Sequence, residues 1–231
     1  MNCKICNNAS EEIFKEKIMN KYYKCYNCGY LFTEEPYWLD EAYKNPINFS
    51  DTGLLDRNIL LAKMTAMIIY SSFNRKEKFL DYAGGYGIFT RLMRDMGFDF
   101  KWFDPYCENI LAKSFEYDNS IDTNIELITS FEVFEHLVNP LEELNKMLNI
   151  SRNIIFSTEF LQEEIPNKNW WYYAFEHGQH ISFYSSKTFQ FIAKKLNLNF
   201  YDFYHLKILT EKKLNKFLIK SLINFSKFDW F

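Results

Sequence analysis

The chain has 231 residues, of which 48% are hydrophobic, and a formal net charge of −3 at pH 7. This length is enough for one α/β domain of ordinary size with a small appendage. The acidic balance argues against a protein built mainly to hold a long nucleic acid, which usually shows a basic surplus. The best candidate for a membrane span, residues 59–70, is short and interrupted by Lys63, and the chain opens without an apolar signal region. We therefore expect a cytoplasmic protein.

Four of the five cysteines form two Cys-x-x-Cys pairs, separated by about 20 residues. Each pair can form a tight turn that presents two thiolates, and Gly29 allows such a turn after the second pair. Two disulfides are the alternative, which the missing secretion signal disfavours. A ribbon of this size buries too little apolar surface to fold alone, so the metal would supply folding free energy. We predict a structural zinc ribbon over residues 1–35, with four ligands: Cys3, Cys6, Cys25 and Cys28.

Residues 36–72 are predicted to connect this ribbon to a main domain. A polar and aromatic stretch containing Pro36 and Pro46 comes first. Residues 54–72 then carry apolar side chains at helical spacing, which predicts a helix.

A glycine-rich turn marks the start of the main domain, predicted over residues 73–205. A short apolar strand runs into Asp81-Tyr-Ala-Gly-Gly-Tyr-Gly87, an amphipathic helix follows, and a second strand ends at Asp104. Glycines let a ligand approach the backbone, and an acid at this strand end can accept hydrogen bonds from ribose hydroxyls. The glycine spacing differs from the Gly-x-Gly-x-x-Gly turn of dinucleotide sites. The pattern predicts a nucleoside-binding βαβ unit.

This unit resembles the class I S-adenosylmethionine-dependent methyltransferases, in particular small-molecule enzymes with a Leu-Asp-x-Gly-x-Gly-x-Gly turn. The resemblance covers about residues 79–200 and implies a Rossmann-like α/β fold, with a mostly parallel seven-stranded sheet and helices on both faces. It implies S-adenosylmethionine as the cofactor, with Asp104 on the ribose. Ala83 departs from the family, in which glycine is usual at that position. The other expected cofactor-binding residues are Asp81, Gly84, Gly85, Gly87, Ser130 and Phe131.

The segment FEVFEHLVNP at 131–140 follows the predicted fourth strand, and strand ends carry the ligands in open α/β sheets. A later segment at 169–189, after the predicted fifth strand, adds two histidines. We expect five side chains to converge where the methyl group meets its acceptor: Glu132, Glu135, His136, His177 and His180.

Three interpretations of these five residues remain open. They can simply brace the loop, or a histidine can act as a general base. Alternatively they hold Mg²⁺, Mn²⁺ or iron, which suit mixed carboxylate and imidazole ligands. Similar residues coordinate a divalent cation in the small-RNA 2′-O-methyltransferases and the ubiquinone-pathway O-methyltransferases that this segment resembles.

A ribbon ahead of a methyltransferase domain is similar to the arrangement in some sugar methyltransferases. The resemblance therefore implies O-methylation of a sugar, sugar nucleotide or related metabolite in surface-polysaccharide biosynthesis. The aromatic run 170–173 is interpreted either as a stacking surface for the acceptor or as a packed lid. A metal-dependent RNA 2′-O-methyltransferase is the rival function, supported by the ribbon and by the metal-type residues and opposed by the acidic balance. A non-catalytic cofactor-binding protein is disfavoured by the intact turn.

The tail, residues 206–231, carries six lysines against two acidic residues. We predict a basic amphipathic helix that lies on an anionic membrane or packs on the domain or on a partner subunit. The sequence decides neither this nor the oligomeric state. The apolar face would consist of Leu214, Phe217, Leu218, Leu222 and Phe225, with Ser221 between them.

Overall fold

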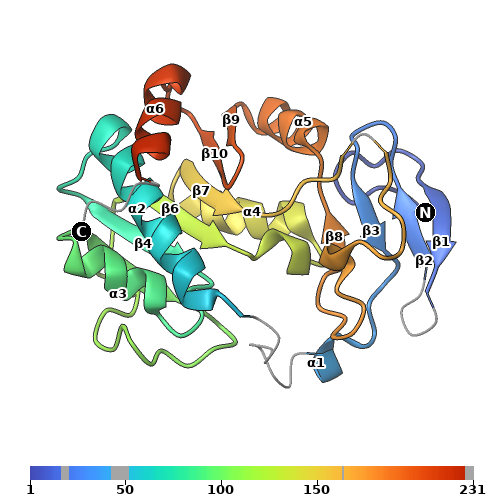
Figure 1. Cartoon of the computed structure of the whole chain (residues 1–231), viewed down its shortest axis with the longest axis horizontal. Coiled ribbons are helices and arrows are strands. Elements are labelled where there is room, and N and C mark those ends of the chain that lie inside the picture. The colour runs from blue at the N-terminus through green and yellow to red at the C-terminus, as the bar shows by residue number, and fades with distance from the viewer. Residues whose placement is uncertain (17–20, 43–51, 163, 227–231) are drawn as a thin grey trace.

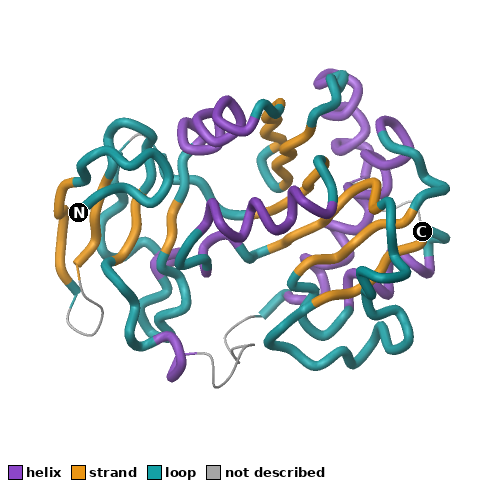
Figure 2. Tube along the Cα trace, turned by 180° about the vertical axis from the view of Figure 1, so that it is seen from behind, coloured by secondary structure: helices purple, strands orange, loops and turns teal. Residues whose placement is uncertain are grey.

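The computed structural model describes residues 1–16, 21–42, 52–162 and 164–226 (Figure 1). Within this part of the chain the strands form two sheets, a four-stranded one near the N-terminus and a six-stranded one in the other half of the molecule (Figures 1 and 2).

The six-stranded sheet has the order β5-β4-β6-β7-β10-β9. The first four strands in this order are parallel, and β10 runs antiparallel to both of its neighbours. The strands are β4 (Lys78–Tyr82), β5 (Asp99–Phe103), β6 (Ile125–Phe131), β7 (Asn153–Ser157), β9 (Asn199–Phe203) and β10 (Leu206–Thr210). The expected Rossmann-like arrangement is confirmed.

Among the described residues the main sheet has six strands, whereas seven were expected. Outside β5, at the edge of the sheet, Trp102 forms a single parallel bridge with Glu116. The chain then turns away, because Asp118 accepts hydrogen bonds from the backbone N–H and the hydroxyl of Ser120. Asp and Ser favour such turns over extended pairing.

Helices cover both faces of this sheet. Apolar side chains of α2 (Leu54–Ser72), α3 (Ile88–Asp95) and α6 (Lys216–Ser226) pack in one core cluster with residues of β4, β5 and β10. Side chains of α4 (Pro140–Ile150) and α5 (Ser186–Leu196) pack in a second cluster on the other face. The helix expected over residues 54–72 is confirmed.

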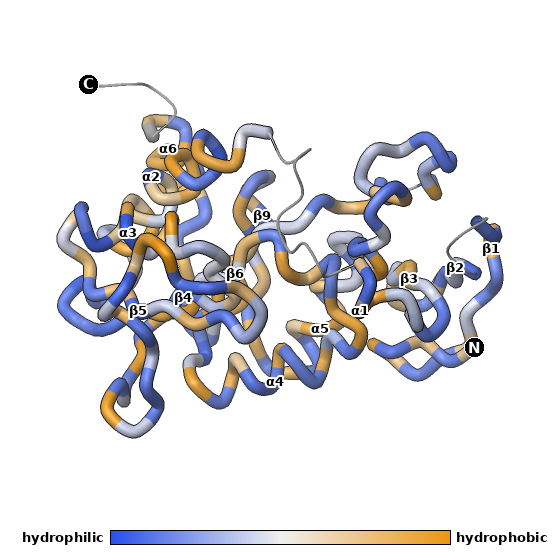
Figure 3. Tube along the Cα trace, turned by 90° about the horizontal axis from the view of Figure 1, so that it is seen from below, coloured by the Kyte–Doolittle hydropathy of each residue, from blue (hydrophilic) through white to orange (hydrophobic). Residues whose placement is uncertain are grey.

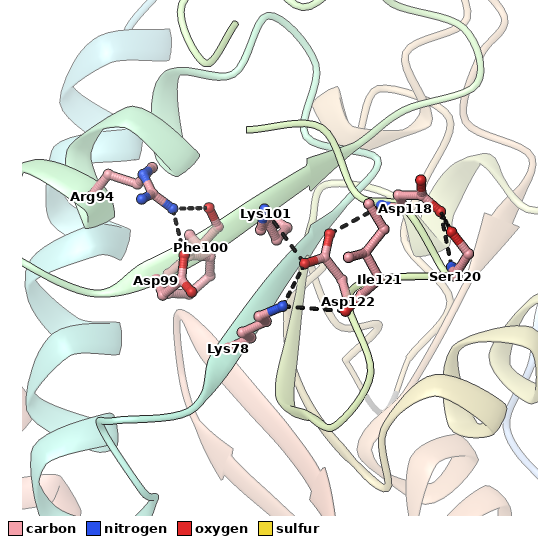
Figure 4. Close-up of polar contacts among 9 residues, drawn as sticks. All are labelled: Lys78, Arg94, Asp99, Phe100, Lys101, Asp118, Ser120, Ile121 and Asp122. Atoms are coloured by element: carbon pink, nitrogen blue, oxygen red, sulfur yellow. Dashed lines mark hydrogen bonds and ion pairs between the residues drawn. The ribbon is translucent and has the colours of Figure 1, made fainter. Parts of the chain in front are cut away.

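Asp122 anchors the loop between β5 and β6 at the end of the sheet remote from the cavity described below. Its carboxylate accepts from Lys78 Nζ at 2.8 Å and from the Asp118 backbone N–H at 3.1 Å, and Lys101 Nζ lies 3.4 Å away (Figure 4). These contacts keep the amino-terminal ends of the central strands in place.

The four-stranded sheet joins the ribbon to the main domain. Its order is β1-β2-β3-β8, from β1 (Glu11–Lys15), β2 (Lys21–Lys24), β3 (Leu31–Thr33) and β8 (Ser182–Phe183). The last strand comes from the segment after β7, which was expected to belong to the methyltransferase domain alone. The sheet of the ribbon therefore includes β8, which lies far along the chain from the predicted domain boundary at residue 35.

The tail differs from its expected form. Leu206–Thr210 is a strand between β7 and β9, and only Lys216–Ser226 is helical. All five residues of this strand are buried, so its run of apolar side chains belongs to a central strand. In the described part of the chain, no helix combines the length and the apolar character needed to cross a bilayer.

Candidate active site

A cavity of about 1540 Å³ lies at the carboxyl ends of β4, β5 and β6. Its walls come from the glycine-rich turn, from the segment after β6, from residues 168–180 and from the start of α2. Pockets for single small ligands usually measure roughly 300–1,000 Å³. The cavity is therefore large enough for a cofactor and a second molecule.

The glycine-rich turn has the backbone that its sequence predicts. Gly85 and Gly87 have φ values of +54° and +83°, and Ala83 also adopts a positive φ, of +59°. A Cβ at Gly84 would lie 2.6 Å from Asp81 Oδ2, and one at Gly87 would lie 2.9 Å from Ala112 Cβ. A Cβ at Gly85 would meet nothing within 4 Å. Gly84 and Gly87 are thus needed for packing, while Gly85 leaves open space beside the cavity.

Asp81 links this turn to the neighbouring helix α3 and strand β6. Its two carboxylate oxygens accept hydrogen bonds from Thr90 Oγ1 of α3 at 2.9 Å and Thr129 Oγ1 of β6 at 3.0 Å. Burial raises the pKa of Asp81 to about 7, although the two hydroxyls oppose the shift. A cation bound nearby would favour its ionised form.

Asp104, directly after β5, holds the rim of the cavity together. Its Oδ2 accepts from the Gly85 backbone N–H at 2.9 Å, and its Oδ1 accepts from the N–H groups of Tyr106 and Cys107. Each carboxylate oxygen has further lone pairs. Asp104 can therefore order the loop and still receive hydroxyl groups of a ligand.

Two residues at the end of β6, Ser130 and Phe131, were predicted to bind the cofactor, and one of them lies at the cavity. Phe131 lines the cavity and packs edge-on against Phe89, with ring centroids 4.8 Å apart. Ser130 is fully buried and is absent from the cavity wall among the described residues. Alternate residues of a strand face opposite sides, which explains why Phe131 lines the cavity and the Ser130 side chain does not.

Two of the predicted histidines are held by backbone carbonyls. His136 Nδ1 donates to the Gln179 carbonyl at 3.1 Å, and His180 Nδ1 donates to the Tyr172 carbonyl at 2.7 Å. Since Nδ1 carries the hydrogen, Nε2 is the nitrogen with a lone pair on each ring. Burial lowers the pKa of His136 to about 3 and that of His180 to about 4. Both rings therefore stay neutral near pH 7.

Glu135 is not part of the cavity wall among the described residues. It is fully buried, and neither carboxylate oxygen accepts a hydrogen bond from any described residue. Burial, reinforced by repulsion from Glu132, raises its pKa to about 8. One ligand atom each of Glu135, His136 and His180 lie within 4.8 Å of one another. A bound cation would stabilise the ionised form of this buried carboxyl group beside two imidazoles.

The other two predicted residues lie at the edge of this group. Glu132 has a φ of +53°, and its Oε1 accepts a hydrogen bond from Ser157 Oγ at 2.6 Å. His177 contacts His180 edge-on, with ring centroids 5.7 Å apart. Both residues line the cavity. The structure therefore brings three of the five predicted side chains into one cluster and places two beside it.

The aromatic run after β7 has a mixed role. Tyr172 and Tyr173 are fully buried in a cluster with Phe183 of β8. Trp171 is 73% exposed and, with Trp170, lines the cavity. The tyrosines are thus packed as a lid would be, and the exposed Trp171 ring is accessible from the cavity.

The four ribbon cysteines converge as predicted. Their sulfur atoms all lie within 4.8 Å of one another, with Cys3 Sγ 3.5 Å from Cys28 Sγ and Cys6 Sγ 3.4 Å from Cys25 Sγ. Four thiolates about 2.3 Å from a common centre are the ligand set of structural zinc. The residues fit this metal.

Sequence reasoning missed several residues of the site. Ser157 fixes Glu132, Trp102 Nε1 donates to the Gly85 carbonyl at 3.0 Å, and Arg57 of α2 lines the cavity. The position of Ser157 at the end of the strand after β6 was a usable signal, since Phe131 and Ser157 are partners in register. Nothing in the local sequence marks Arg57.

A model of a family described as "Methyltransferase domain" matches residues 57–202. No curated protein matches the chain. Among solved structures, the crystal structure of TnmH has a TM-score of 0.51 and 13% identity, covering 75% of this chain and 60% of TnmH. The mitomycin 7-O-methyltransferase MmcR has a TM-score of 0.49 and 13% identity, covering 67% of this chain and 52% of MmcR. Human N-acetylserotonin methyltransferase, solved with S-adenosylmethionine, has a TM-score of 0.44 and 14% identity, covering 69% and 52%. This chain thus spans little more than half of these proteins, and the likeness to TnmH shows the fold.

Proposed function

This chain belongs to the methyltransferase-domain family, and we propose that it methylates a hydroxyl group of a small, sugar-derived acceptor. The main support for this proposal is that one cavity contains both the predicted cofactor-binding residues and the histidines. The glycine-rich turn and Asp104 form one part of its wall, and His136, His177 and His180 form another. Bound S-adenosylmethionine supplies an electrophilic methyl group. The remaining task of the protein is to orient the hydroxyl and receive its proton.

The cofactor would be held by the turn at residues 81–87 and by Asp104. The open space beside Gly85 allows close approach to the backbone. Asp104 would accept hydrogen bonds from the two ribose hydroxyls. Phe131, which lines the cavity, would border the methyl group.

Replacing Asp104 by alanine should weaken cofactor binding by about 2–4 kcal/mol, because two hydrogen bonds to a charged acceptor are lost. Isothermal titration calorimetry with S-adenosylhomocysteine measures this directly. Asp118→Ala is the matched control, since Asp118 also accepts a backbone N–H, that of Ser120, in the same connection. Unchanged affinity in the Asp104 variant would remove this residue from the cofactor site.

The charge of the cavity wall supports an uncharged acceptor. Among the described lining residues, six are acidic and three are basic: Asp81, Asp104, Glu132, Glu142, Glu143 and Glu176 against Arg57, Lys146 and Lys168. A wall of this sign repels a polyanion, which weighs against RNA and against a nucleotide-linked sugar. Trp170 and Trp171 would provide apolar surfaces for the faces of a sugar ring.

The cluster of Glu135, His136 and His180 would hold a divalent cation beside the acceptor. Two neutral imidazoles with Nδ1 fixed by carbonyls, together with one carboxylate, are typical metal ligands. This mixed set suits Mn²⁺ better than Mg²⁺, which prefers oxygen ligands only. A bound cation would lower the pKa of an acceptor hydroxyl.

We assign zinc to the four cysteines as a structural metal. Four thiolates leave no open coordination position, so this site would take no part in the chemistry.

Methyl transfer to a panel of free sugars, sugar nucleotides and short RNA tests the function. The purified protein is incubated with isotopically labelled S-adenosylmethionine, and products are identified by mass spectrometry. We expect label on a hydroxyl oxygen of an uncharged sugar or glycoside. Label on RNA alone, or on nitrogen or carbon, would contradict the proposal.

A further inference from the structure

Helix α6 has two apolar faces, of which the fold uses one. Ile219 and Ile223 are buried in the core cluster that includes residues of α2. On the opposite side, Phe217 is 88% exposed, Phe225 is 59% exposed and Leu218 is 46% exposed. These three residues form most of the apolar face that the sequence predicted. Figure 3 shows hydrophobic residues alternating with hydrophilic ones along α6, next to α2.

Lysines border this exposed face. Lys213, Lys216 and Lys220 are exposed and form no ion pair with any described residue. Their neighbour Lys212 is instead paired with Glu126 at 2.5 Å, and Glu211 lies near Arg152 at 3.7 Å. The positive charge at α6 is thus uncompensated in a chain whose net charge is −3.

The positions of these residues on the helix follow from its geometry. At 100° per residue, Phe217, Ser221, Phe225 and Leu218 lie within about 100° of one another, and Lys216 and Lys220 lie on one flank. Phe217 and Phe225 are roughly 12 Å apart along the axis. A helix with aromatic residues in a stripe and lysines at its border is suited to the interface of a bilayer.

We propose that α6 docks on an anionic lipid surface. Phe217, Leu218 and Phe225 would enter the boundary between headgroups and acyl chains, while the lysines contact lipid phosphates. Charge decides between this and a second copy of the chain. A twofold contact through this face would bring the lysines of both copies together without acidic partners.

Co-sedimentation of the full chain with vesicles tests this proposal. Vesicles of phosphatidylcholine alone are compared with vesicles that also contain phosphatidylglycerol. We expect binding only to the second kind, with a partition coefficient that falls as ionic strength rises.

Phe217→Ser/Phe225→Ser should lower the partition coefficient about 10-fold or more, because two exposed aromatic rings are lost from the docking face. Lys216→Gln/Lys220→Gln should lower it as well. The controls are Ile121→Ser, which removes another exposed apolar side chain, and Lys113→Gln/Lys194→Gln, which removes two exposed lysines elsewhere. Because Ile219 and Ile223 are untouched, the melting temperature and turnover of the α6 variants should match those of the wild type.

Three results would overturn the proposal. The first is no binding to either vesicle, and the second is equal binding to both. The third is a dimer, detected by light scattering, that becomes a monomer in Phe217→Ser/Phe225→Ser while vesicle binding is absent.

Discussion

Replacing His180 by alanine should lower turnover at least about 100-fold and leave cofactor affinity unchanged. His136→Ala should act in the same way. Each ring is oriented by a hydrogen bond from Nδ1, from His180 to the Tyr172 carbonyl and from His136 to the Gln179 carbonyl. Both residues line the cavity apart from the glycine-rich turn, so we expect their loss to change the handling of the acceptor. Steady-state kinetics and calorimetry with S-adenosylhomocysteine separate the two effects.

His205→Ala is the matched control, because His205 is the one histidine of the four that lies outside the candidate site, at the exposed turn between β9 and β10. Its replacement should leave turnover unchanged. If His180→Ala and His136→Ala keep wild-type turnover, the cluster has no role in the reaction.

The same variants separate a metal site from a metal-free base. A base works best when its pKa lies near the working pH, whereas burial lowers the pKa of His180 to about 4. Such a ring is a weak base but a good ligand, since metals bind neutral imidazole. We therefore expect chelators to inhibit the wild type and Mn²⁺ to restore it. Mn²⁺ should also raise the melting temperature of the wild type, but not that of Glu135→Gln or His180→Ala. Indifference to chelators, with no shift in melting temperature, would favour the base.

Local sequence was sufficient to predict the part of the site that depends on the backbone. The turn at 81–87 needs glycine because a Cβ at Gly84 or Gly87 would collide with neighbouring side chains. The short strand, the helix and Asp104 are all within about 25 residues of it, so their relative positions follow from one βαβ unit. This part of the fold could therefore be predicted without knowing which distant segments of the chain pack against it.

Long-range pairing was the part that the sequence did not reveal. Leu206–Thr210 is a short apolar run, and only its partners β7 and β9 show it to be a strand. Ser182–Phe183 is too short to be recognised as a strand without β3 beside it. The separation of Glu132 from the three clustered residues has the same origin, because Ser157 of the neighbouring strand holds its carboxylate. Residue type and spacing indicated the chemistry, whereas partners far along the chain decided which side chains meet.

Several hydrogen bonds join the ribbon to the two segments that carry His136 and His180. Tyr30 Oη lies 2.6 Å from Ser182 Oγ, which donates to the Leu137 carbonyl at 2.6 Å, directly after His136. Lys4 Nζ donates to the Val138 carbonyl at 3.0 Å. The Ile181 backbone connects both sides, since its carbonyl accepts from the Thr33 N–H and its N–H donates to the Glu135 carbonyl. The segments that carry Glu135, His136 and His180 therefore rest on the ribbon.

Loss of the cysteine site should consequently lower turnover strongly and leave cofactor binding nearly unchanged. In Cys25→Ser/Cys28→Ser we expect the bound zinc to be lost and the ribbon to unfold, because such metals supply about 10 kcal/mol or more of folding free energy in small zinc domains. Strand β8 would lose its partner, and the loops bearing the histidines would lose their support. Turnover should fall at least about 100-fold, while affinity for S-adenosylhomocysteine should change less than about 3-fold, since the turn at 81–87 and Asp104 belong to the central sheet.

Elemental analysis should find one zinc per wild-type chain and none in the double variant. Cys107→Ser is the matched control and should keep both zinc and turnover. Burial, reinforced by repulsion from Asp104, raises the pKa of the Cys107 thiol to about 11, so thiol titration of the native protein should find no fast-reacting cysteine. A double variant that lacks zinc and retains turnover would show that the ribbon does not support the histidines. Four freely reactive thiols in a zinc-free wild type would rule out the metal site itself.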